Sequence, residues 1–177
     1  HFSGEIPKHE NLTTIINEAP DVCTAALVNG YLKGRHLDWA VTGAFGDNLK
    51  DTARTLASGL NISEHDLVSL EALGTYINYN GYGPAIEDLH FDPKDLYLKL
   101  YAADGPLDFV QNSADFNKLS AGYGEDMAKA EALQPLHSNA TSAVFILPDE
   151  TWARRVSGVY SNDLATENPE RAHAVLT

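Results

Sequence analysis

The fold class is indicated most clearly by residues 142–176, which read SAVFILPDETWARRVSGVYSNDLATENPERAHAVL. Residues 142–147 form a short apolar run, which predicts a buried strand. Asp149 is expected to cap a helix that runs from Glu150 to about residue 165, and residues 173–176 are expected to form a second strand. A strand–helix–strand unit predicts the α/β class, with residues 142–177 beginning a smaller mixed α/β C-terminal domain.

The preceding residues, 1–133, are expected to form one domain and a helical connector, followed by a polar linker at residues 134–141. A strand is predicted at residues 12–16, where four β-branched residues follow Leu12. Residues 37–45 are apolar, and their periodicity does not distinguish a buried strand from a buried helix. Helices are predicted at residues 22–32, 49–60, 63–79, 93–102, 106–111 and 115–133.

Three helix starts carry a recognisable signal. Asp21 is expected to cap the first helix, and Asp92 before Pro93 is expected to cap the helix at residues 93–102. Ser63 with Asp66 three residues later comes close to a capping box. Between these helices, residues 78–84 are predicted to form a loop rich in asparagine, tyrosine and glycine.

Composition excludes several functional classes. The 177 residues include 12 Lys and Arg against 25 Asp and Glu, a formal net charge of −13. Long nucleic acid is therefore not an expected partner, because its phosphates are bound by clustered Lys and Arg. The single cysteine, Cys23, excludes an internal disulfide framework and a cysteine-based zinc site, and it suits a reducing compartment, so a cytoplasmic location is expected. No run approaches the roughly 18 apolar residues of a membrane span, and no membrane partner is expected.

The two ends of the sequence suggest a segment of a longer protein. The sequence begins at His1 and ends inside the apolar run of residues 174–176, without a turn after it. We therefore expect part of the functional site to be contributed by residues outside this sequence.

Asp47 is the strongest single candidate for chemistry. It lies in Gly46-Asp47-Asn48, directly after an apolar element that would hold its carboxylate rigidly. Carboxylate oxygens are the preferred ligands of hard divalent ions such as Mg²⁺ and Mn²⁺. The alternative is a turn-forming aspartate that caps the next helix.

Other candidates are weaker when taken alone. His90 precedes a helix start and could serve either a site or a cap, and the loop at residues 78–84 could place its amides and tyrosines on a ligand or form a simple turn. Arg154 and Arg155 could meet a phosphate or carboxylate, or could be two exposed helix residues. No phosphate-binding P-loop, dinucleotide fingerprint or serine-nucleophile elbow is present, which argues against the enzymes that use them.

Several stretches, in order, resemble the DHH phosphoesterase superfamily. Residues 1–7 (HFSGEIP) look like the tail of its Asp-His-His motif, and residues 39–48 (WAVTGAFGDN) look like its fourth motif. Residues 73–83 (LGTYINYNGYG) are similar to the segment after that motif in the exonuclease-like branch. Residues 142–147, 158–162 and 173–176 resemble the opening of the C-terminal substrate-binding domain.

The resemblance implies a metal-dependent phosphoesterase that uses Mn²⁺ or Mg²⁺, with two ions in the complete protein. It implies that Asp47 and His1 are metal ligands, and that His1 is also catalytic or touches the scissile phosphate. Two ions can clamp the attacking and leaving oxygens and lower the pKa of bound water. The substrate-side residues implied are Asn48, Asn78, Asn80, Tyr82, His90 and Arg155. The fold implied is the later part of a parallel-sheet DHH-type domain.

This sequence lacks the other metal-binding motifs of the family and the glycine-rich motif of its C-terminal domain. We therefore expect the 177-residue chain to be inactive alone. The expected substrate is a small phosphorylated molecule or a short oligonucleotide. Two alternatives remain: a non-catalytic DHH-like binding module, and an acyl-CoA-dependent transferase, for which neither a glycine-rich CoA loop nor a reactive nucleophile is visible.

Overall fold

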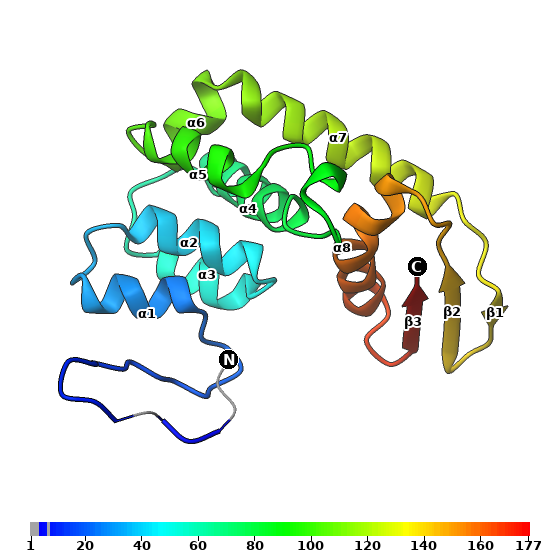
Figure 1. The fold of residues 1–177 in the computed structure, drawn as a ribbon, viewed down its shortest axis with the longest axis horizontal. Helices are drawn as coiled ribbons and strands as arrows, with labels where there is room; N and C mark the ends of the chain where they lie inside the picture. The colour runs from blue at the N-terminus through cyan, green and yellow to red at the C-terminus, as the bar shows by residue number, and fades with distance from the viewer. Residues whose placement is uncertain (1–3, 7) are drawn as a thin grey trace.

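The computed structural model describes residues 4–6 and 8–177 and shows a mixed α/β protein that is mostly helical (Figure 1). The helices, in order, are α1 (Thr24–Tyr31), α2 (Leu37–Gly46), α3 (Lys50–Ala57), α4 (Glu64–Tyr79), the short 3₁₀ helix η1 (Ile86–Asp88), α5 (Pro93–Tyr101), α6 (Pro106–Asn112), α7 (Ala114–Glu131) and α8 (Thr151–Glu167). The strands are β1 (His137–Ser138), β2 (Ser142–Ile146) and β3 (Ala172–Leu176).

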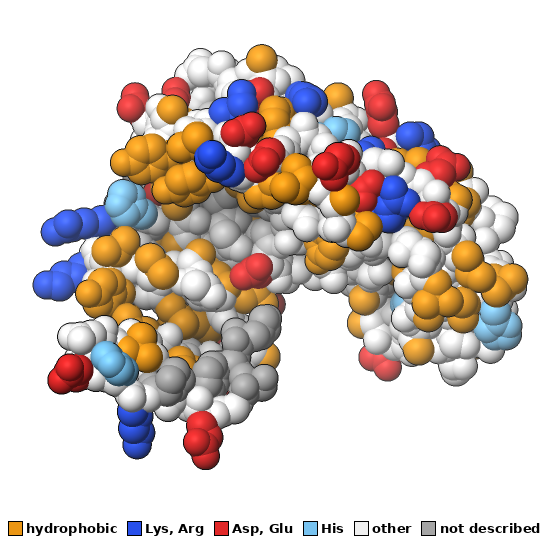
Figure 2. Space-filling model, viewed as in Figure 1, with side chains coloured by type: hydrophobic (Ala, Val, Ile, Leu, Met, Phe, Trp, Pro, Cys, Tyr) orange, Lys and Arg blue, Asp and Glu red, His pale blue; other side chains and the backbone are white. Residues whose placement is uncertain are grey.

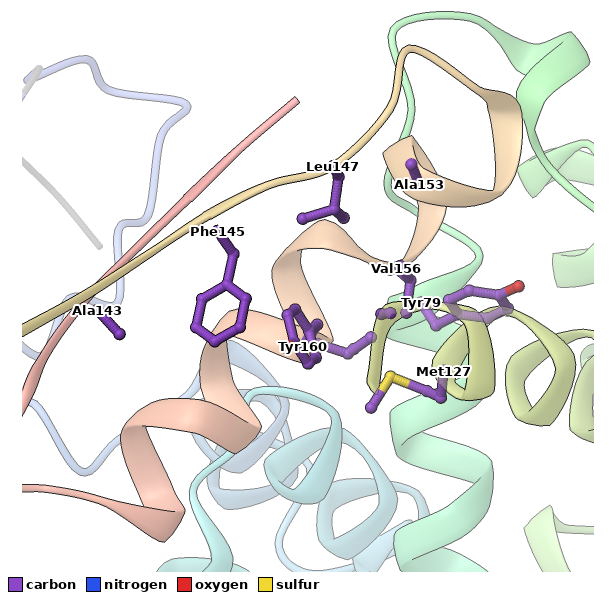
Figure 3. Packing of buried hydrophobic residues seen from close by; sticks show 10 residues of the cluster. Tyr79, Met127, Ala143, Phe145, Leu147, Ala153, Val156 and Tyr160 are labelled. Carbon is purple, nitrogen blue, oxygen red and sulfur yellow. The ribbon is translucent and has the colours of Figure 1, made fainter. Parts of the chain in front are cut away.

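The predicted strand–helix–strand unit is confirmed. β2 and β3 pair in parallel, with Val144 opposite Ala174, and β1 pairs with β2 in the antiparallel direction. α8 covers one face of this sheet, where Phe145 and Leu147 point toward Val156 and Tyr160 (Figure 3). The alternation of buried and exposed residues along β2 therefore places one face of the strand in the core.

The helical part is built around α2 and α4. The sequence pattern of residues 37–45 fits either a buried strand or a buried helix, and in the structure these residues belong to the helix α2. α2 packs on α1, α3 and α4. α2 and α4 cross at small residues: a Cβ added to Gly46 would lie 2.9 Å from the carbonyl oxygen of Gly74. The crossing is therefore close enough that it depends on glycine on both helices.

The helix starts were predicted with mixed success. The Ser63–Asp66 capping box is present, and Asp92 caps α5 by accepting a hydrogen bond from the Lys94 amide. The N-cap of α1 is Cys23 rather than Asp21, and the N-cap of α8 is Glu150 rather than Asp149.

The strand predicted at residues 12–16 is wrong. These residues have no strand partner among the described residues, and a β-branched run alone does not make a strand without a ladder to join. Residues 4–6 and 8–133 hold helices and loops with no strand, so the parallel-sheet domain that the resemblance implies for this part is not found there. The expected linker at residues 134–141 contains β1. None of the helices in the described ranges combines the length and hydropathy needed to cross a membrane.

Candidate functional site

The C-terminal end of α2 is closed by a Schellman motif that fixes Asp47 and Asn48. The amide of Leu49 donates to the carbonyl of Ala44, and the amide of Asn48 donates to the carbonyl of Phe45. Asn48 has a φ of 57°, the left-handed conformation that this motif requires and that asparagine tolerates. Asp47, the C-cap residue, is thereby held at a defined position rather than on a mobile turn.

The Asp47 carboxylate is exposed and has no hydrogen-bond or ion-pair partner within residues 4–6 and 8–177. It borders a cavity of about 260 Å³ whose other walls include Trp39, Gly74 and Asn78. A carboxylate at a helix C-terminus lies beside the negative end of the helix dipole, which costs about 0.3–1 kcal/mol unless a cation is present. The N-cap of α3 is Leu49, so Asp47 does not cap the next helix, and its role as a metal ligand stays a prediction.

A second cavity, of about 250 Å³, lies beside the first. Gly46 and Asn78 line both, and Asn48 lines the second together with Lys50 and Asp163. Its walls come from the α2–α3 turn on one side and from α8 on the other, and the molecule is hollowed between these two parts (Figure 2). The structure thus brings the predicted residues Asp47, Asn48 and Asn78 to one region.

Charged groups make the second cavity polar. Lys50 pairs with Glu71 at 3.0 Å. Burial, with the nearby charges of Glu167 and Glu131, raises the pKa of the Asp163 carboxyl above its usual value, although Lys50 opposes the shift. The cavity therefore holds an ammonium group and a carboxyl that gives up its proton less readily than usual.

Three other predicted residues lie in a separate region, on the segment that joins α4 to α5. Asn80 is buried, and its side chain donates to the carbonyl of Phe91 and accepts from the Phe91 amide, which closes the segment into a loop. Tyr82 lies over Gly158 of α8, and His90 lies over Gly122 of α7, where in each case a Cβ would collide with the ring. These residues pack the loop onto the C-terminal part of the molecule.

A buried polar cluster holds α4, α7 and α8 together. We refer to Tyr79, His90, Asp126 and Arg155 as the Tyr79 cluster. The Tyr79 hydroxyl donates to the Asp126 carboxylate and lies 2.8 Å from Nε2 of His90. Arg155 donates from Nε to the same carboxylate at 2.8 Å and from a terminal nitrogen to the carbonyl of Asp88 at 2.8 Å. Burial and the bond to Asp126 raise the pKa of Tyr79, so the hydroxyl keeps its proton as a donor.

The neighbouring Arg154 makes a second connection between the two parts of the chain. It donates two hydrogen bonds to the Asp88 carboxylate, at 2.7 and 3.2 Å, and one to Asp149 at 2.6 Å. These bonds hold the pKa of the Asp88 carboxyl below its usual range. Both arginines therefore have carboxylate partners inside this chain, and a role for Arg155 in substrate binding stays a prediction.

The sequence analysis did not single out Asp88, Asp126 or Asp163, and it included Tyr79 only as one of the tyrosines of the loop at residues 78–84. Their partners are far apart in the sequence, 47 residues for Tyr79–Asp126 and 66 residues for Asp88–Arg154, so no local spacing indicates them. The adjacent pair Arg154-Arg155 in an acidic chain was the one available signal. This pair indicates binding to a carboxylate or a phosphate, but it does not indicate which residue or ligand carries that group.

The described residues do not form the predicted metal centre. His1 lies outside the described residues, so its predicted roles as a metal ligand and a catalytic residue stay predictions. Within residues 4–6 and 8–177 no group of three or more His, Cys, Asp or Glu side chains is placed to hold an ion. The described residues thus offer one candidate ligand, Asp47, and do not by themselves complete a site for Mn²⁺ or Mg²⁺.

We expect His90 to make stability depend on pH. Burial, reinforced by the charge of Arg155, lowers the pKa of His90, so the folded protein favours the neutral ring. As pH falls below about 6.5 the unfolded chain takes up the proton first, and folding stability decreases until the folded-state pKa is reached. Urea unfolding between pH 7.5 and 5 should therefore show that the free energy of unfolding falls more steeply with decreasing pH in the wild type than in His90→Gln. The two slopes should differ by at most about 1.4 kcal/mol per pH unit.

His65→Gln is the matched control, because the His65 side chain is 90% exposed. This variant should keep the wild-type slope. Equal slopes for the wild type and His90→Gln would contradict the assignment of a neutral, buried His90.

Comparison of the chain with protein-family models, with curated proteins and with solved structures gave no significant match.

Proposed function

We propose that the protein is a metal-dependent phosphoesterase of the DHH type, acting on a phosphodiester or a small phosphate ester, with Asp47 as a metal ligand. In this proposal the helical part is the later portion of a DHH-type catalytic domain, and the β2–α8–β3 unit begins the substrate-binding domain. The remaining ligands would come from His1 and from residues outside this sequence. We assign no reaction step, because the described residues supply a single candidate ligand.

The observation that carries the proposal is the placement of the Asp47 carboxylate. It is exposed, it has no partner within the described ranges, and it belongs to the C-cap residue of α2, at the negative end of the helix dipole, which attracts a cation. The Schellman motif that holds it supplies the rigidity that a ligand needs.

The two neighbouring cavities support a small substrate. Their volumes, about 260 and 250 Å³, suit a compact ligand, and the amides of Asn48 and Asn78 can donate hydrogen bonds to its oxygens. A net charge of −13 disfavours a long polyanion.

We expect Asp47→Asn to abolish activity without loss of stability. The intact gene product should hydrolyse bis(p-nitrophenyl) phosphate in the presence of Mn²⁺, and Asp47→Asn should lower the rate by at least about 100-fold, more than an outer-shell change costs. Its free energy of unfolding should stay the same or rise by up to about 0.5 kcal/mol, because a charge is removed from the negative end of α2.

Asp51→Asn is the control, since it removes one exposed carboxylate four residues away, in the first turn of α3. It should keep the wild-type rate. Absence of Mn²⁺-dependent hydrolysis would overturn the proposal in favour of the non-catalytic binding module, and saturable binding of coenzyme A would favour the transferase.

A further inference from the structure

The largest cavity described lies at the opposite end of α2 from Asp47. Its volume is about 470 Å³, and its walls come from the start of α2, from Ile77 of α4 and from α5 with the turn that follows it. Figure 2 shows hydrophobic side chains gathered at this end of the molecule, where α5 faces α2. We refer to it as the α5 cavity.

Three aromatic rings form much of its wall. Trp39 comes from α2, and Tyr97 and Tyr101 come from successive turns of α5, with ring centroids 6.0 Å apart and planes inclined by 27°. The two tyrosines are 60% and 76% exposed, so a ligand can reach them from solvent. Aromatic faces carry negative electrostatic potential and attract cations, most strongly in the case of tryptophan.

The charges of the α5 cavity also favour a cation. Asp104 lines it, and the Asp104 carboxylate has no hydrogen-bond or ion-pair partner in the described part of the chain. The other titratable groups of the wall are the two tyrosines and His36, and no lysine or arginine belongs to the lining. The adjoining residue Asp108 is also acidic and is bonded to uncharged donors, the amide of Asp104 and the side chain of Asn112, so it adds negative charge nearby.

We propose that the α5 cavity binds a small organic cation with an apolar body, such as an alkylammonium or quaternary ammonium compound. The aromatic faces and Leu100 would contact the apolar body, and the aromatic rings together with Asp104 would balance the positive charge. A neutral apolar molecule would not interact with the charge of the Asp104 carboxylate, and an anion would be repelled by that charge. This proposal goes beyond the phosphoesterase proposal and does not depend on it, although the α5 cavity and the Asp47 cavity share Trp39 and Ile77.

The two tryptophans of the chain allow a direct test. Trp39 lines the α5 cavity, and Trp152 packs against the core beneath the sheet, so in a Trp152→Phe background the fluorescence reports on Trp39. The probes are choline and 3,3-dimethylbutan-1-ol, which have nearly the same shape and differ in charge. We expect choline to change the Trp39 emission saturably, with an affinity at least about tenfold higher than that of the neutral alcohol.

Variants identify the groups responsible. Tyr101→Leu and Asp104→Asn alter exposed side chains and should each weaken choline binding about three- to tenfold. Tyr31→Leu, which changes a similarly exposed tyrosine on α1 outside this cavity, should leave binding unchanged. Equal affinity for the two probes, no saturable change with either, or the same loss in Tyr31→Leu would each overturn the proposal.

Discussion

Replacement of Arg155 by methionine should lower the free energy of unfolding by up to about 3–5 kcal/mol, because it removes the closer of the two cations that pair with a buried carboxylate. The Asp126 side chain is 3% exposed and that of Arg155 is 12% exposed, and the two groups lie 2.8 Å apart. Methionine can replace the aliphatic stem of Arg155 but not its hydrogen bonds to Asp126 and to the carbonyl of Asp88. Tyr79 remains as an uncharged donor to Asp126, and the one cation left beside the carboxylate is Lys129, which is half-exposed and lies 3.7 Å from it.

Arg54→Met is the control, because it removes an arginine–carboxylate pair that lies at the surface. The Arg54 side chain is 48% exposed and that of its partner Glu64 is 69% exposed, so water replaces the lost interaction. We expect a clearly smaller loss in urea unfolding. The double variant Asp126→Leu/Arg155→Met should regain much of the stability that Arg155→Met loses, since both buried charges are then removed. Equal losses for the two arginine variants would contradict the role given to the Tyr79 cluster.

Replacement of Gly74 by alanine should cost about 3 kcal/mol, an unusually large effect for one methyl group. The added Cβ would lie against the carbonyl oxygen of Thr42, well inside van der Waals contact, and 2.8 Å from the backbone nitrogen of Gly46. These are backbone atoms of α2 and cannot rotate away, so the two helices must separate. Because α2 ends in Asp47, the separation should also disturb the Asp47 cavity.

The control for this variant is Gly124→Ala in α7, where a Cβ would have open space around it. Alanine is favoured over glycine inside a helix by about 0.5–1 kcal/mol, so this variant should be more stable than the wild type. Thermal unfolding of the two variants should therefore move in opposite directions. A Gly74→Ala protein as stable as the wild type would show that α2 and α4 do not pack closely at their glycines.

Features that depend on neighbouring residues could be predicted from the sequence. The capping box at Ser63, the cap at Asp92 and the β2–α8–β3 order each follow from a pattern within a few residues. The predicted strand at residues 12–16 failed, because strand formation depends on a pairing partner that the segment itself does not encode.

The site was predictable only in part, for a related reason. Asp47 and Asn48 were found because they follow an apolar run directly. Their closeness to Asn78 results from the crossing of α2 over α4 at Gly46 and Gly74, which no local spacing predicts. The Tyr79 cluster likewise joins residues 11 to 76 positions apart on four separate segments, so its members could not be recognised as one group.

Titration of the intact gene product with Mn²⁺, with the free ion followed by electron paramagnetic resonance, measures whether Asp47 binds a divalent ion. We expect the wild type and Asp51→Asn to remove stoichiometric Mn²⁺ from solution, and Asp47→Asn to lose at least one bound ion per chain while folding normally. Identical titration curves for the wild type and Asp47→Asn, or no stoichiometric binding by the wild type, would contradict the proposal that Asp47 is a metal ligand.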